Sequence, residues 1–237
     1  MLYFFLDNAV GFMGLLGYYM DNVPLWLSLI SLVLYTLVPY MLGSINTAVI
    51  VSTVMYNDDI RNYGSGNAGF TNVMRTFGMK AAVITFVGDI LKTIVSVMIG
   101  WCFFGYLSAY IAGFACFIGH ILPCFYQFRG GKGVLCAASM VFMLDWRLFL
   151  ILVGLFILAV AITKYISFGS MLSAMVYPLV LNRMNGTGLR MIEFIAMAVA
   201  VIIVIKHKEN LKRIFNGTES KFSFKRSKKK AEGSDNG

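Results

Sequence analysis

Three polar segments interrupt an otherwise apolar chain, and they hold most of its residues able to do chemistry. The first spans residues 59–75 and contains Gly64-Ser65-Gly66, where the glycines let backbone N–H groups approach an anion closely. Asn67, Thr71 and Arg75 follow at intervals of four, so they share one face if a helix begins there. The segment therefore offers amides, hydroxyls and a guanidinium, which are groups that bind phosphate.

The second polar segment, residues 119–133, ends in glycines around a lysine. Its last four residues are Gly130, Gly131, Lys132 and Gly133. Exposed amides with one point charge are typical of a phosphate-binding loop. The pattern is not a Walker A loop, because Tyr126 stands where the first glycine belongs and no Ser or Thr follows Lys132. A tight turn between two helices explains the same glycines, and both interpretations stay open.

The third polar segment begins at His207 and includes Asn210, which is a neighbour of His207 if the preceding helix continues. Two further ionisable residues, Asp89 and Lys92, lie three apart inside an apolar run. Charges within a membrane are costly, so they are usually paired or functional. We favour a pair within one helix over a catalytic role for these two.

The composition indicates which class of protein positions these segments. Of the 237 residues, 59% are hydrophobic and 13% are charged, and the mean hydropathy is +0.76. A soluble domain carries about 25% charged residues, so the composition excludes a soluble enzyme, a disordered chain and a secreted disulfide scaffold. We expect an all-α integral membrane protein with about seven transmembrane helices. The expected spans are 24–54, 81–104, 107–126, 132–144, 148–163, 166–182 and 189–206.

Basic residues predict the orientation of these spans. With the N-terminus outside, 16 of the 20 Lys and Arg face the cytoplasm and three face outward. The C-terminus and all three polar segments are then cytoplasmic. Residues 1–23 form an apolar extension expected at the interface, residues 24–206 the membrane domain, residues 207–222 the third polar segment, and residues 223–237 a disordered basic tail beside anionic lipid.

Together the three segments resemble the PlsY family, the bacterial acyl-phosphate:glycerol-3-phosphate acyltransferases. The resemblance runs from Tyr40 to about Phe222 in the family's order and spacing. In the first segment it is carried by Asp59-Ile-Arg61, Gly64-Ser65-Gly66-Asn67 and Thr71-Asn72-Val73 with Arg75. In the second it is carried by Gly119-His120 and the glycines around Lys132, and in the third by His207, Glu209-Asn210, Arg213 and Gly217-x-Glu219. Any one segment alone is a moderate signal, whereas three in order on one predicted face are specific.

The resemblance implies acyl transfer from an acyl phosphate to the 1-position of glycerol 3-phosphate, with lysophosphatidic acid and phosphate as products. It implies no metal and no cofactor, a multi-pass protein of the bacterial cell membrane, and a monomer working near an enzyme that makes acyl phosphate. The implied catalytic residues are Ser65, His207 and Asn210. The implied substrate-binding residues are Arg75, Lys132, Gly130, Gly131, Gly133, Asn67, Thr71 and Glu209.

Two other classes of function fit parts of the sequence. A membrane transporter of phosphorylated metabolites would use the polar loops as a gate, but no inverted repeat or paired broken helices are evident. A scaffold protein with a lipid-binding tail leaves the three segments unexplained. Nucleic acid is not an expected partner, because no aromatic-studded basic domain accompanies the tail.

Overall fold

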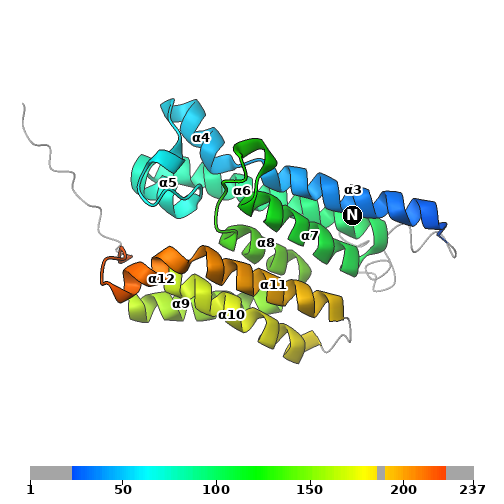
Figure 1. Ribbon diagram of the computed structural model, residues 1–237. Coiled ribbons are helices and arrows are strands. Elements are labelled where there is room, and N and C mark those ends of the chain that lie inside the picture. Colours follow the sequence, from blue (N-terminus) through cyan, green and yellow to red (C-terminus); the bar gives the residue numbers. More distant parts are fainter. Residues whose placement is uncertain (1–22, 186–189, 223–237) are drawn as a thin grey trace, which may run out of the picture.

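The computed structural model describes residues 23–185 and 190–222, and within these ranges every regular element is helical (Figure 1). The helices are α3 (Leu25–Ser44), α4 (Thr47–Tyr56), α5 (Phe70–Phe77), α6 (Met79–Phe104), α7 (Tyr106–Ile121), α8 (Val134–Leu144), α9 (Trp146–Thr163), α10 (Ile166–Asn185), α11 (Arg190–Lys206) and α12 (Lys208–Phe215), with 3₁₀ turns η1 (Ile60–Asn62) and η2 (Cys124–Tyr126). The all-α class is confirmed. The expectations for residues 1–22 and 223–237 lie outside the described residues.

The long helices form two layers that share one axis direction (Figure 1). Helices α3, α6 and α7 pack against one another in the first layer, and α9, α10 and α11 make the second. Helix α8 joins the layers because it packs against α6, α7 and α9, and α11 also touches α7. The short helices α5 and α12 lie at the same end of the bundle, one from each layer (Figure 1).

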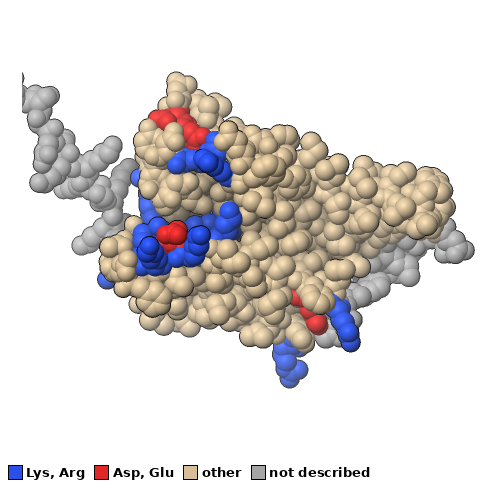
Figure 2. All heavy atoms as spheres, viewed as in Figure 1, with Lys and Arg blue, Asp and Glu red and all other residues tan. Residues whose placement is uncertain are grey.

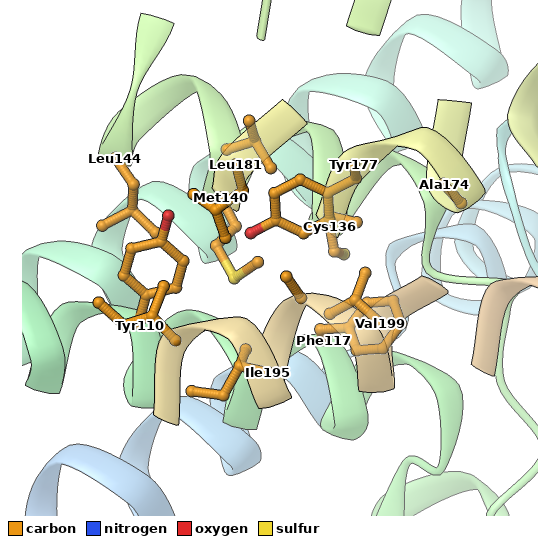
Figure 3. Packing of buried hydrophobic residues seen from close by; sticks show 14 of the residues in the cluster. Tyr110, Phe117, Cys136, Met140, Leu144, Ala174, Tyr177, Leu181, Ile195 and Val199 are labelled. Atoms are coloured by element: carbon orange, nitrogen blue, oxygen red, sulfur yellow. The ribbon is translucent and has the colours of Figure 1, made fainter. Parts of the chain in front are cut away.

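Close packing of side chains holds the layers together (Figure 3). Phe117 of α7 and Met140 of α8 are fully buried, and Tyr177 of α10 and Val199 of α11 lie against the same cluster. Gly113 makes room for Met140, because a Cβ added at Gly113 would lie 2.6 Å from Met140 Cγ. Such contacts carry helix association in lipid, where burial of apolar surface no longer drives it.

Within residues 23–185 and 190–222, four helical segments are long and apolar enough to cross a membrane. They are Leu25–Tyr56, Met79–Phe104, Tyr106–Tyr126 and Trp146–Thr163. Helix α8 is apolar but has 11 residues, which is about 16 Å at 1.5 Å per residue and about half of the ~30 Å hydrocarbon thickness. Helices α10 and α11 match the last two expected spans in position but fall outside this count, so a total of seven spans stays a prediction.

The first expected span, 24–54, is one segment in the sequence but two helices in the structure. Helix α3 ends at Ser44, and α4 restarts at Thr47 with Asn46 as its N-cap, whose side chain accepts a hydrogen bond from Val49 N at 3.1 Å. The Lys92 ammonium satisfies the carbonyls of Gly43 and Ile45 at 3.1 and 2.9 Å. These two caps explain the break, which hydropathy alone does not reveal.

Candidate active site

The three polar segments come together at the end of the bundle that carries α5 and α12 (Figure 1). Figure 2 shows two groups of Lys and Arg side chains at this end, each with carboxylates among them, and a hollow of uncharged residues between the groups. A smaller charged group lies far from this end, near the junction of α10 and α11. The charge distribution therefore singles out this end, where most of the charged side chains visible on this face lie.

Asn72 organises the first segment. Its Nδ2 donates to the carbonyls of Tyr63 and Ile60 at 2.9 and 3.3 Å, and its Oδ1 accepts from Ser65 N at 3.1 Å. Gly64 has φ +56° and its Cα lies against that amide, since an added Cβ would be 2.3 Å from Asn72 Oδ1. Glycine is required there on both grounds. Asn72 thus fixes the loop that presents Ser65.

Arg61 joins the first segment to the second. It pairs with Asp59 at 2.6 Å and donates from Nη1 to the carbonyl of Tyr126 at 3.0 Å. The Arg61 guanidinium holds the pKa of the Asp59 carboxyl below its usual value, against the smaller opposing effect of burial. The pair therefore stays ionised at neutral pH and ties the two loops together.

The glycines of the second segment are packing requirements. A Cβ at Gly130 would lie 2.0 Å from the carbonyl oxygen of His120, and one at Gly131 would lie 2.2 Å from His120 Nε2 and 2.8 Å from the carbonyl of Ala68. Gly131 N also donates to the carbonyl of His120 at 3.1 Å. Gly133 has φ +77°. This close fit supports the tight-turn interpretation, and it leaves Lys132 as the charged group that the turn presents.

Lys132 contacts the third segment directly. Its ammonium donates to Asn210 Oδ1, and Asn210 Nδ2 donates in turn to Glu219 Oε1 at 2.7 Å. Ser167 Oγ donates to the same oxygen at 2.7 Å, and Arg213 Nε donates to Glu219 Oε2 at 2.8 Å. Asn210 and Glu219 are buried. Glu219 therefore holds Asn210 with its amide oxygen turned toward Lys132.

His207 lies at the junction of α11 and α12 and is 3% exposed. Its Nδ1 is 2.8 Å from the carbonyl oxygen of Ile203. A carbonyl only accepts, so Nδ1 carries the proton and Nε2 keeps a lone pair. Burial, together with the positive charge of Lys132, lowers the pKa of His207 to about 4. The imidazole is therefore neutral at neutral pH and able to accept a hydrogen bond at Nε2.

Positive charge exceeds negative charge around Lys132. Burial lowers the pKa of Lys132 to about 8; Glu219 acts against this, and the charges of Arg213 and Arg75 add to it. Glu219 keeps its carboxyl ionised, because hydrogen bonds from Asn210, Arg213 and Ser167 outweigh the rise in pKa that burial causes. Three cations facing one carboxylate leave a site suited to a phosphate dianion.

The remaining expected site residues lie around this centre. Thr71 and Arg75 share a face of α5, with Arg75 exposed in its last turn, whereas Asn67 lies in the loop before the helix. Ser65 is exposed, and in the described residues no hydrogen bond joins it to Lys132, His207 or Asn210. Glu209 is exposed in the first turn of α12. The residue-by-residue roles stay predictions.

Sequence reasoning gave no role to three residues that organise this site. Glu219 and Ser167 complete the network around Asn210, and Asn72 orders the first loop. Glu219 carried a signal, since an acid two residues after Gly217 belongs to the third segment of the resemblance. Ser167 lies in the first turn of α10, where its type and spacing give no signal.

Comparison with known proteins places the chain among related sequences. The family model "Glycerol-3-phosphate acyltransferase" matches residues 33–217. The glycerol-3-phosphate acyltransferase of Finegoldia magna is 38% identical over 193 residues, which cover 80% of this chain and 96% of that protein. The glycerol-3-phosphate acyltransferase of a Thermoanaerobacter species is 39% identical over 193 residues, covering 81% and 96%.

Two solved structures share the fold. A crystal structure of PlsY, an integral membrane glycerol 3-phosphate acyltransferase, in its glycerol 3-phosphate form has a TM-score of 0.76 and 30% identity, covering 81% of this chain and 96% of that one. A second, in the lysophosphatidic acid form, has a TM-score of 0.73 and 29% identity with the same coverage.

Proposed function

The chain belongs to the glycerol-3-phosphate acyltransferase family, and on this premise we propose that it takes its acyl group from an acyl phosphate. The acyl group passes to the 1-position of glycerol 3-phosphate, giving lysophosphatidic acid and inorganic phosphate, as the first step of phospholipid synthesis. One observation carries the proposal: the half-buried Lys132 of the second segment and the buried Asn210 and Glu219 of the third form one network at the positively charged end of an apolar bundle.

The cations of this network suit both substrates, because each carries a phosphate. Lys132, Arg75 and Arg213 supply the positive charge, and Glu219 fixes Arg213 through a 2.8 Å contact. Arginine and lysine bind phosphate oxygens by charge-assisted hydrogen bonds, which are roughly twice as strong as neutral ones. We assign Arg75 and Lys132 to phosphate binding. Asn67 in the first loop, Thr71 in α5 and the glycines around Lys132 assist them.

The reaction needs little covalent help from the protein. The 1-hydroxyl oxygen attacks the carbonyl carbon of the mixed anhydride, a C–O bond forms, and the bond to the phosphate oxygen breaks. Because phosphate is a good leaving group, positioning and electrostatic stabilisation supply most of the acceleration. His207 Nε2 accepts the hydrogen bond of the hydroxyl and Asn210 orients it. With a pKa of about 4, His207 is too weak a base to keep the proton, which leaves on the released phosphate.

The proposed setting is a bacterial cell membrane with the site facing the cytoplasm. The bias of basic residues supports this orientation, with seven spans, the N-terminus outside and the C-terminus inside. Helices α10 and α11 lie in one layer with α9, which is membrane-capable, so all three are proposed to share the bilayer. We propose a monomer that takes acyl phosphate, a lipid-like molecule, from an enzyme nearby.

Phosphate release is the direct test of this function. The purified protein in lipid vesicles should release phosphate from palmitoyl phosphate only when glycerol 3-phosphate is added, with lysophosphatidic acid formed in equal amount. Palmitoyl-CoA and palmitoylated acyl carrier protein serve as control donors and should give no product. A product that forms from acyl-CoA but not from acyl phosphate would overturn the proposed donor, while phosphate release that does not depend on glycerol 3-phosphate would overturn the transfer itself.

We expect no covalent acyl intermediate on Ser65. In the described residues no basic side chain is hydrogen-bonded to its hydroxyl, and the donor is already activated, so an extra covalent step offers little gain. Incubation with palmitoyl phosphate in the absence of glycerol 3-phosphate, followed by intact-mass measurement, should show the unmodified mass. An adduct of one palmitoyl group that is missing in Ser65→Ala would replace direct transfer by a two-step mechanism.

A further inference from the structure

A second polar cluster lies inside the bundle, away from the phosphate-binding cations. Asp89 and Lys92 of α6 and His120 of α7 are all buried, at 2%, 8% and 4% exposure. Lys92 Nζ is 2.8 Å from Asp89 Oδ1 and 2.9 Å from His120 Nδ1. Ionised side chains in a membrane segment are expensive to keep. The proposed reaction makes no use of these three residues, so their retention needs its own explanation.

Lys92 occupies the open end of a broken helix. Its ammonium donates to the carbonyls of Gly43 and Ile45 at 3.1 and 2.9 Å, where α3 ends. Carbonyls at the C-terminus of a helix lack partners within the helix, and the helix dipole favours a cation beside them. With Asp89 and His120 as further acceptors, four acceptors surround the three N–H groups of the ammonium, so all three are used and one is shared. Lys92 thus fixes where α3 stops.

Asp89 contacts the other side of the same break. Thr47 Oγ1 donates to Asp89 Oδ1 at 3.2 Å, and Thr47 is the first residue of α4. The N–H groups at a helix N-terminus lack partners within the helix, and the helix dipole favours an anion beside them. The ion pair therefore has its cation at the end of α3 and its anion at the start of α4. It sets the direction in which α4 leaves the bundle, and α4 leads into the loop of Asp59 and Ser65.

His120 connects the same pair to the glycine turn. Lys92 is a donor only, so His120 Nδ1 accepts and the ring proton lies on Nε2. Nε2 lies against Gly131, where an added Cβ would approach to 2.2 Å, and the carbonyl of His120 accepts from Gly131 N at 3.1 Å. The next residue along the chain is Lys132. One buried cluster thus contacts the helix before the first loop and the turn of the second.

We propose that Lys92 is a positioning residue for acyl transfer, which holds the first loop through the break between α3 and α4 and holds Lys132 through His120 and the glycine turn. The inference rests on the proposed function, since it assigns Lys92 to the geometry of that site. It differs from a role in stability alone, because a purely stabilising ion pair is replaceable by two uncharged side chains, whereas a positioning one is not.

The first experiment separates these roles with paired variants in the full-length protein. Lys92→Met leaves Asp89 unpaired, and we expect a lower unfolding temperature together with at least a tenfold rise in KM for glycerol 3-phosphate. The double variant Asp89→Asn/Lys92→Met removes both charges. It should regain most of the unfolding temperature while KM stays at least tenfold raised. Recovery of KM together with stability in the double variant would overturn the proposal.

A second variant decides the matter if the double variant unfolds. His120→Asn keeps an acceptor near the position of Nδ1 for Lys92 but removes the part of the ring that lies against Gly131. We expect a wild-type unfolding temperature and a KM raised at least fivefold; an unchanged KM would overturn the proposal. Thr85→Val is the matched control, because Thr85 is buried one turn earlier on α6 and bonds only to the carbonyl of Ala81. A wild-type protein that fails to use palmitoyl phosphate would instead refute the proposed function, whatever the variants do.

Discussion

Replacing Lys132 with methionine should lower kcat/KM for glycerol 3-phosphate by about 30- to 5,000-fold. Methionine keeps much of the length of the side chain and removes its charge. Removing the charged partner of a buried phosphate oxygen weakens binding of the transition state by ~2–5 kcal/mol. At about 1.4 kcal/mol per factor of ten, this gives the expected range. Steady-state kinetics in vesicles measure the effect. Lys80→Met is the control, because Lys80 is an exposed lysine in the first turn of α6.

The pH dependence of KM gives a second readout of the same residue. The pKa of Lys132 is lowered to about 8, so in the free enzyme its charge is complete well below pH 8 and is lost as the pH rises through that value. A phosphate monoester is already a dianion there, since its second pKa is about 6. KM for glycerol 3-phosphate should therefore rise above pH 8. Lys132→Arg, which keeps its charge, should lack this rise. More than half the wild-type rate in Lys132→Met would remove Lys132 from the site.

Replacing Glu219 with glutamine should impair folding stability and catalysis together. The carboxylate accepts hydrogen bonds from Ser167, Asn210 and Arg213 and is buried. Glutamine replaces one accepting oxygen with a donor and leaves Arg213 without a counter-charge. Removing one partner of a buried ion pair lowers the free energy of unfolding by about 3–5 kcal/mol. We expect a clear fall in unfolding temperature and at least a hundredfold fall in kcat/KM.

The acid side of the stability profile tests the same residue. Because the folded protein holds the pKa of Glu219 below its usual 4.5, its contribution is complete above about pH 4.5 and is lost as the pH falls through the lowered value. The glutamine variant should lack that part of the acid-induced loss. Glu193→Gln, in the first turn of α11 at the other end of the bundle, is the matched control. A Glu219→Gln protein with normal stability and rate would show that Asn210 needs no buried acceptor.

Hydropathy predicted the helices of this protein well, because long apolar runs admit few other structures in lipid. It failed at residues 45–46, where the break depends on Lys92, a residue more than 40 positions away in the sequence. The resemblance implied Glu209 as the substrate-binding acid of the third segment, and Glu209 is exposed on α12. Helix α12 ends at Phe215, and the chain then reverses at Gly217, which has φ +69°. Glu219 N donates to the carbonyl of Arg213, and this turn returns Glu219 to the buried side. Local patterns cannot report contacts that a turn creates.

The glycines around Lys132 are a second case in which the sequence alone left two structures open. Their types and spacing indicated a loop around Lys132, and they left open whether that loop binds an anion or only turns tightly. The structure answers through His120, whose carbonyl and ring fill the space that side chains at Gly130 and Gly131 would need. Asn72 was not predicted at all, because an asparagine within a polar stretch carries no signal until its three partners are placed around it.

The shortness of α8 has a consequence for the phase from which we expect each substrate to arrive. Helices α8 and α9 meet at Asp145 and contain 11 and 18 residues, so the start of α8 falls about 10 Å short of the far end of α9 at 1.5 Å per residue. If α9 crosses the whole membrane, we expect Lys132, two residues before α8, at the depth of the lipid glycerol backbones instead of in bulk water. The proposed acyl donor would then reach Lys132 by lateral diffusion within the membrane, whereas glycerol 3-phosphate would arrive from bulk water. We therefore expect surface-dilution kinetics, in which added inert lipid slows the enzyme even when the total amount of donor is unchanged.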